Sequence, residues 1–221
     1  MNTEIPRSSG FFVKLQLKLA IVYTLIFILV FAVAFVWFYN YADQVAKTRI
    51  NESLLYALNA GTSRISGDDV TGLFETAEPT LFNDRGTADP DDDIYYTDDQ
   101  RFWEIADWLN TIRIVDPNAA PWIFMRPDPA GDPDGFYYVI DGLALTVPLS
   151  DAAVSFKEYD TAIDGKLFIG LDRTATFLDD AYEWEGTWWV SGYTPIHNSA
   201  GEIVAGLGID YQAQYIIDVE T

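Results

Sequence analysis

The chain has 221 residues, of which 49% are hydrophobic and 15% aromatic, so it is long enough for a membrane segment and one domain with a sizeable core. Its net charge of −21 arises after residue 40, and so acidic an exterior repels nucleic acid and anionic lipid headgroups, which argues against a nucleic-acid partner. The absence of cysteine excludes disulfides, iron–sulfur clusters and thiolate zinc sites.

An apolar run near the N-terminus, Leu19–Tyr39, contains no charged residue, proline or glycine. At about 1.5 Å per residue it spans the roughly 30 Å hydrocarbon core of a bilayer. Trp37, Tyr39 and Tyr41 supply aromatic side chains at its far end, which is typical of a membrane interface. We therefore predict a transmembrane signal-anchor helix over residues 19–40.

Basic residues outnumber acids before this run, with Arg7, Lys14 and Lys18 against Glu4. This bias predicts that residues 1–18 are cytoplasmic, that this chain crosses the cell inner membrane once, and that the rest is extracytoplasmic. A cleaved signal peptide is the alternative, because Ala32–Ala34 resembles a cleavage site. We favour the uncleaved anchor, since the apolar run is longer than the roughly 7–15 residues of a signal peptide's core.

Residues 41–66 read as a long amphipathic helix that leaves the membrane without a break. Its apolar residues recur close to helical spacing: Ala42, Ala46, Ile50, Leu54, Leu58 and Ile65. Two compatible interpretations follow. The stripe packs on its own domain, or it forms the seam of a homodimer.

Residues 67–221 are predicted to form one extracytoplasmic domain, whose first part is helical. A helix starts at "GDDVTGLF" with Asp68 or Asp69 as its cap and ends before Pro79. A second helix follows Asp98 and Asp99 and ends at Asp116-Pro117. Between them, residues 83–99 are dense in aspartate. We interpret this segment as a solvated loop rather than a Ca²⁺ site, because its carboxylates lack a fixed ligand spacing.

After Pro121 the pattern changes from helix to strand. Trp122–Arg126 and Phe136–Gly142 are rich in strand-forming residues and flank a turn, so they predict a hairpin. Residues 151–163 and 174–182 are predicted as helices, the first stopped by Asp164-Gly165.

The last hairpin is predicted from "WWVSGYTPIHNSAGEIVAGLGIDY", residues 188–211. In its first strand Trp189, Ser191 and Tyr193 share one face, since side chains alternate along a strand. In its second strand, one face is apolar and the other is small, with Gly206 and Gly208 before Asp210. Glycines in a strand indicate that another group approaches the sheet closely.

The segment from Ala162 to Tyr211 resembles extracellular Cache sensor domains, which are also described as PDC or PAS-like. Their shared pattern is a "dG" pair followed by "wG.w.sgy.Pi.ds.G.vvgvlgvD". The matching residues here are Asp164, Gly165, Gly186, Trp188, Trp189, Ser191, Gly192, Tyr193, Pro195, Ile196, Gly201, Val204, Gly206 and Asp210. His197-Asn198 departs from the pattern, since an acid is more common at that turn.

The resemblance implies an α+β fold, in which a transmembrane helix runs into a long helix and then into a PAS-like antiparallel sheet flanked by helices. It also implies signal transduction. Such domains bind small metabolites (amines, amino acids or carboxylates), commonly work as homodimers, and pass a signal to a cytoplasmic kinase, cyclase or chemotaxis module. The output module is absent from this chain.

Candidate ligand-binding residues are Asp210, Tyr193, Trp188, Trp189, Arg126, Tyr138 and Asp141. In amino-acid-binding members of the family, an acid in this part of the sheet holds the ligand's ammonium, and the alternative is that Asp210 caps a strand end or bonds to a neighbouring loop. Arg126 can hold a carboxylate or form a surface ion pair. The aromatic residues can wall a pocket or pack in the core.

The sequence carries no catalytic constellation, so we predict neither an enzyme nor a cofactor. His197 is the single histidine, which argues against a metal site or a catalytic triad. Two functions stay open: an extracytoplasmic small-molecule sensing domain, which we favour, and a membrane-anchored interaction or assembly module without a small ligand.

Overall fold

The structure is a computed structural model that describes residues 15–126, 132–162, 165–178, 181–184 and 186–213. It divides into two compact units, Met1–Ala46 and Lys47–Thr221. Helix α1, Leu15–Thr62, begins in the first unit and ends in the second. Among the described residues, α1 is one helix that is long and apolar enough to cross a membrane, by length and composition.

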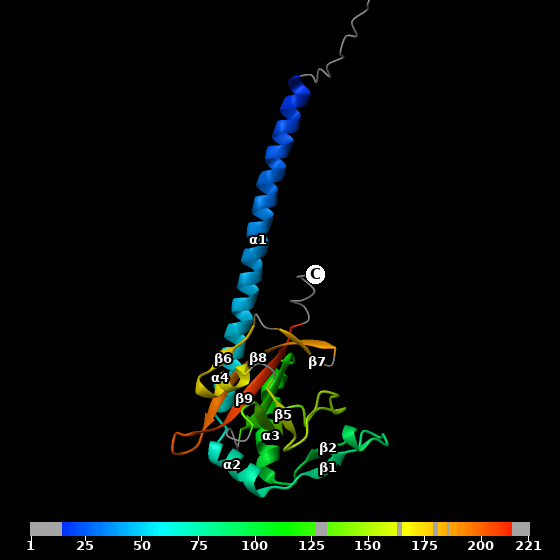
Figure 1. Cartoon of the computed structure of the whole chain (residues 1–221), viewed down its shortest axis with the longest axis vertical. Coiled ribbons are helices and arrows are strands. Elements are labelled where there is room, and N and C mark those ends of the chain that lie inside the picture. The colour runs from blue at the N-terminus through cyan, green and yellow to red at the C-terminus, as the bar shows by residue number, and fades with distance from the viewer. Residues whose placement is uncertain (1–14, 127–131, 163–164, 179–180, 185, 214–221) are drawn as a thin grey trace, which may run out of the picture. The chain divides into compact units, whose positions relative to one another are not determined.

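The second unit is built on a seven-stranded antiparallel sheet (Figure 1). Its strands lie in the order β5-β4-β3-β9-β8-β6, and β7 also pairs with β8. Their bounds are β3 Ala119–Met125, β4 Gly135–Asp141, β5 Tyr159–Thr161, β6 Ala175–Thr176, β7 Tyr182–Trp184, β8 Thr187–His197 and β9 Ile203–Gln212. A separate two-stranded sheet pairs β1, Thr80–Asn83, with β2, Ile94–Tyr96.

The described part of this unit also contains three further helices and one 3₁₀ turn: α2 Gly67–Thr76, η1 Pro90–Asp92, α3 Gln100–Val115 and α4 Lys166–Asp172. The predicted fold class, an apolar N-terminal helix followed by an antiparallel sheet flanked by helices, is confirmed. Both predicted hairpins are also present, since β3 pairs with β4 and β8 with β9. Residues 127–131 of the first hairpin's turn lie outside the described residues.

One face of the sheet carries the main hydrophobic core. Ile123, Val139, Val190 and Leu207 come from its four central strands and are fully buried against helical residues. The end of α1 contributes Ile50, Leu54 and Leu58 to this core. Of the two interpretations of the α1 stripe, packing on its own domain is therefore confirmed. Because Ile50 and Leu54 are covered by that domain, they leave no exposed seam there, and a homodimer stays a prediction.

Of the helix boundaries predicted from the sequence, those of α3 are confirmed and the N-terminal cap of α2 is wrong. Asp99 caps α3 by accepting a bond from the Arg101 N–H, and α3 ends at Val115 with Asp116 as its C-cap, as the Asp116-Pro117 pair predicted. The prediction that Asp68 or Asp69 caps α2 is wrong, because Ser66 precedes the helix and its hydroxyl accepts from the Asp69 N–H. The carboxylates of the first turn still favour the helix through its dipole.

The two helices predicted in the third quarter of the chain are wrong. Residues 151–162 form turns and β5, and the described residues of 174–182 contain β6 and the start of β7, because pairing with β4 and β8 overrides local propensity. Ile163 and residues 179–180 lie outside the described residues. The predicted helix stop at Asp164-Gly165 is instead a start: Gly165 has φ 69° and caps α4. A glycine suits that left-handed position. Asp164 lies outside the described residues. The predicted loop over residues 83–99 contains η1 and β2.

Candidate ligand-binding site

The other face of the sheet is hollowed into a cavity of about 240 Å³. Strands β3, β4, β8 and β9 form its floor, and residues of α4 and of the segment 143–154 form its walls. Aromatic side chains dominate the lining: Trp122, Phe136, Tyr138, Phe177, Tyr182, Trp189 and Tyr193. A concave, mostly apolar site with a few polar groups is what small-molecule binding requires.

The glycines of β9 make room for this aromatic floor. A Cβ atom at Gly208 would lie 2.7 Å from the Trp122 indole, and one at Gly206 would lie 2.2 Å from the Phe124 ring. The close approach predicted from the glycine pattern is thus confirmed: aromatic rings of β3 lie across the small-residue face of β9.

Asp210 is the acid of this floor. It faces Ser191 in β8 and Ala120 in β3. Its carboxylate accepts a bond from the Trp122 indole N–H at 2.8 Å and one from the Ser191 hydroxyl at 2.5 Å. The Tyr182 hydroxyl lies 2.9 Å from that of Ser191. These side-chain bonds place Asp210 in the cavity floor, two residues before β9 ends, and not as a cap of the strand end.

The environment of Asp210 raises its pKa to about 6. Burial is the main cause, and the bonds from Ser191 and Trp122 oppose it by stabilising the carboxylate. At neutral pH the group is therefore mostly ionised. A carboxylate held between aromatic rings attracts an organic cation, since the ring faces add their own attraction to positive charge.

Asp141 lies at the end of β4 and is 5% exposed. It accepts bonds from the Leu143 N–H at 2.8 Å, the Val154 N–H at 3.0 Å and the Tyr96 hydroxyl at 3.4 Å. Burial raises its pKa to about 7, although these bonds oppose the shift. Because its oxygens hold both ends of the segment 143–154, Asp141 shapes the cavity wall.

Asp160 and Lys166 add charge to the rim of the cavity. The Tyr138 hydroxyl lies 3.4 Å from the Asp160 carboxylate. Burial, followed by the nearby carboxylates of Asp160 and Asp210, raises the pKa of Tyr138. Tyr138 therefore stays protonated and available as a hydrogen-bond donor.

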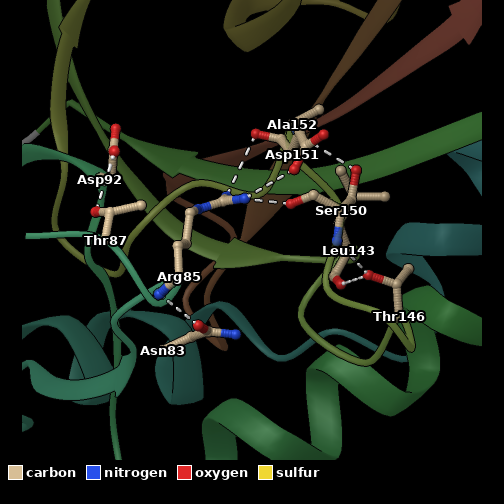
Figure 2. Close-up of polar contacts among 9 residues, drawn as sticks. All are labelled: Asn83, Arg85, Thr87, Asp92, Leu143, Thr146, Ser150, Asp151 and Ala152. Atoms are coloured by element: carbon tan, nitrogen blue, oxygen red, sulfur yellow. Dashed lines mark hydrogen bonds and ion pairs between the residues drawn. The ribbon is translucent and has the colours of Figure 1, made fainter.

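An arginine outside the cavity holds the same wall segment in place (Figure 2). The Arg85 guanidinium donates to the Ser150 and Asp151 carbonyl oxygens at 3.1 and 3.3 Å, and to the Asp151 carboxylate at 3.1 Å. Inside the segment, Ser150 bonds to Thr146. Leu143, Ala152 and Val154 of this segment face the cavity, so Arg85 fixes a wall that it does not itself line.

The structure brings five of the seven sequence-predicted site residues to the cavity: Asp210, Tyr193, Trp189, Tyr138 and Asp141. Trp188 does not line it, because neighbouring residues of a strand point to opposite faces. Arg126 does not line it either. Its guanidinium stacks over the Phe168 ring at 4.1 Å and donates to the Pro133 carbonyl. A surface ion pair of Arg126 stays a prediction, because the adjoining residues 127–131 lie outside the described residues.

Sequence reasoning missed Trp122, Ser191 and Tyr182 as site residues. Strand alternation already put Ser191 beside Trp189 and Tyr193, so that residue was within reach of the sequence. Tyr182 was not, because it reaches the site through the pairing of β7 with β8. Among the described residues, no group of three or more His, Cys, Asp or Glu could hold a metal ion.

Neither a protein-family model nor a curated protein sequence matches this chain. Among solved structures, it is similar to the ligand-binding domain of the Campylobacter jejuni chemoreceptor Tlp3 in complex with 4-methylisoleucine, at 9% identity and a TM-score of 0.38, covering 80% of this chain and 58% of that one. The same domain in complex with L-valine matches at 11% identity and a TM-score of 0.38, covering 80% and 59%.

The extracellular domain of a histidine kinase, mmHK1S-Z2, is similar at 14% identity and a TM-score of 0.33, covering 77% of this chain and 63% of that one. This chain thus spans about three fifths of the length of these structures.

Proposed function

We propose that this chain is the extracytoplasmic sensing part of a membrane-anchored receptor and that its cavity binds a small organic amine, including the amine of an amino acid. The observation that carries the proposal is Asp210, an ionised acid in an aromatic cavity. A desolvated ammonium requires such a fixed carboxylate. The motif that resembles Cache domains supports the same function, since Asp210 is its last residue.

The cavity favours an amine over a simple carboxylate. Asp141, Asp160 and Asp210 all line it, whereas Lys166 is its single basic residue among those described. A ligand's positive group would lie beside Asp210, and its apolar part would contact Trp122, Tyr138 and Tyr193. A volume of about 240 Å³ suits a metabolite of modest size.

The same strands that form the site contact the end of α1 on the opposite face. A Cβ atom at Gly192 would lie 3.0 Å from Leu58, and one at Gly61 would lie 2.5 Å from Leu207. Gly192 follows Ser191, whose hydroxyl bonds to Asp210. A ligand that shifts Asp210 and Ser191 would therefore displace strands on which α1 packs, and we propose this contact as the route of the signal.

The test is a calorimetric screen of amines, amino acids and carboxylates on the full chain in lipid nanodiscs, followed by Asp210→Asn. The substitution keeps the size of the side chain and removes its charge. Loss of a charge-assisted bond should reduce the affinity for the amine identified by the screen about ten- to a hundredfold. The melting temperature should stay near that of the parent. Unchanged affinity would remove Asp210 from the site, and a screen without any hit would favour the interaction module.

Membrane topology is tested separately. The basic residues before the apolar run predict a cytoplasmic N-terminus in the inner membrane. A reporter that is active only in the cytoplasm, fused after Thr221, should therefore be silent. Strong reporter activity would reverse the proposed orientation without bearing on the cavity.

A further inference from the structure

A second recess adjoins the cavity, and its lining is polar where that of the cavity is aromatic. It has a volume of about 310 Å³ and is lined mainly by polar groups, among them Arg113, Asn118, Ser150, Thr187 and Gln212. Ala120, Leu143, Ala152 and Trp189 line both spaces. The two are therefore neighbours that share a wall.

Arg113, in the last turn of α3, is the cation of this recess. Its side chain is half-buried, and its Nε atom is fully buried without a hydrogen-bond partner among the described residues. Buried polar groups are rarely left unpaired. Although the chain has 34 acidic and 13 basic residues, this Nε donates no hydrogen bond to any of the described carboxylates.

The carboxylates near Arg113 are already engaged elsewhere. Asp151 lines the recess, but its side chain pairs with Arg85 at 3.1 Å. Asp141 acts on Arg113 only through its charge, because its oxygens accept bonds from Leu143, Val154 and Tyr96. Burial lowers the pKa of Arg113 and Asp141 opposes this shift, yet a guanidinium stays protonated at any physiological pH.

The sheet register sets the spacing between the two spaces. Asp210 pairs with Ser191, and two residues later Gln212 pairs with Trp189. The two rows lie on the same face of the sheet, about 7 Å apart along the strands. Trp189 and Gln212 line the recess that Arg113 also lines, so this recess begins one row of side chains away from Asp210.

We propose that the Arg113 recess is an oxyanion-binding subsite that takes a carboxylate group. The carboxylate comes from one of two sources: a free small anion, or the far end of the ligand whose amine lies at Asp210. The second source rests on the proposed function of the cavity, whereas the first does not. The spacing of the rows favours a ligand in which several carbon atoms separate the amine from the carboxylate.

The experiment follows the Arg113 side chain directly, on the full chain in detergent micelles with isotope-labelled arginine. The Nε–Hε resonance that disappears in Arg113→Gln is that of Arg113. It is titrated with acetate, with 5-aminopentanoate and with pentylamine, which lacks the carboxylate. A role limited to helix packing would not make this resonance respond to carboxylates. Arg173→Gln, which removes an exposed arginine and the same charge, serves as the matched control.

A shift of the Arg113 resonance with acetate would identify the free anion as the source, whether or not the cavity binds amines. A shift with 5-aminopentanoate alone would identify the bifunctional ligand. In that case Arg113→Gln should reduce affinity for 5-aminopentanoate about ten- to a hundredfold and leave affinity for pentylamine unchanged. The control variant Arg173→Gln should change neither affinity. A resonance that responds to neither carboxylate would overturn the subsite and leave the proposed amine site untouched.

Discussion

The two faces of the sheet are built from the same four central strands, yet one is closed and the other is hollow. On the closed face, aliphatic residues such as Ile123 and Leu207 meet α1, α2 and α3 in a continuous core. On the hollow face, Trp122 and Phe124 form a smaller cluster with Phe136 and Leu167, beside the cavity. Residues of the short helix α4 and of the segment 143–154 line this cavity. Buried aliphatic packing is thus concentrated on one face and the cavity on the other.

The largest expected effect lies on the closed face. Leu58→Ala removes a side chain that is 0% exposed, and such core truncations cost about 2–5 kcal/mol of unfolding free energy. Denaturant titration of the full chain in micelles measures this loss. Leu55→Ala on the exposed side of the same helix is the control and should change stability by less than about 0.5 kcal/mol. If the two faces divide as we argue, the loss of stability in Leu58→Ala should exceed its effect on amine affinity, which is limited to the coupling through Gly192.

Gly208→Ala should affect stability and binding together, because it acts on the hollow face. The added methyl group would lie 2.7 Å from the Trp122 indole, whose N–H bonds to Asp210. Overpacking of this kind costs about 1–3 kcal/mol, and the displaced indole should also weaken amine binding. Thermal melts and calorimetry check both. Ile203→Ala, at an exposed position of the same strand, should leave both unchanged. A normal amine affinity in Gly208→Ala would separate Trp122 from the site.

The hollow face should also respond to pH. Asp210 has a pKa raised to about 6, so it becomes neutral as pH falls through that value and loses its attraction for a cation. Affinity for the amine should therefore fall about tenfold between pH 7.5 and pH 5, since about a tenth of the group stays ionised at the lower pH. In Asp210→Asn this dependence should disappear, and its persistence there would assign the titration to another group.

Folding stability should also depend on pH, because the pKa values of two buried acids are shifted. The pKa values of Asp210 and Asp141 are raised above those of the unfolded chain, so the folded state holds protons that the unfolded state releases first. These two groups therefore make folding less favourable as pH rises from about 4 towards about 7. Asp210→Asn should remove its share of that dependence, as measured by denaturant titration across the same pH range.

The smallest effect is expected at Arg85, which holds the cavity wall from outside (Figure 2). Arg85→Met removes its bonds to the Ser150 and Asp151 carbonyl oxygens. The binding free energy of the amine should become about 0.5–1.5 kcal/mol less favourable. Asp151→Asn removes only the ion pair with a fully exposed carboxylate and should change affinity less. Equal losses in the two variants would assign the effect to surface charge rather than to the wall.

Much of the fold was readable from local patterns. The apolar run at 19–40, the helix that Asp116 caps and the two hairpins each depend on the period of hydrophobic residues and on their boundary residues. The segment between β4 and β8 was misread, because β5, β6 and β7 are only two or three residues long. Strands that short carry no period of their own and form only through pairing with a neighbouring strand.

For the site, the sequence by itself placed Asp210 on the glycine face of the last strand and put Trp189 and Tyr193 together, because alternation along a strand is a local property. Only the tertiary structure decided that Trp122 bonds to Asp210 across 88 positions of the chain, and that Arg113 faces a recess beside the same cavity. Contacts between distant segments depend on the order and register of the strands, and no local pattern specifies these.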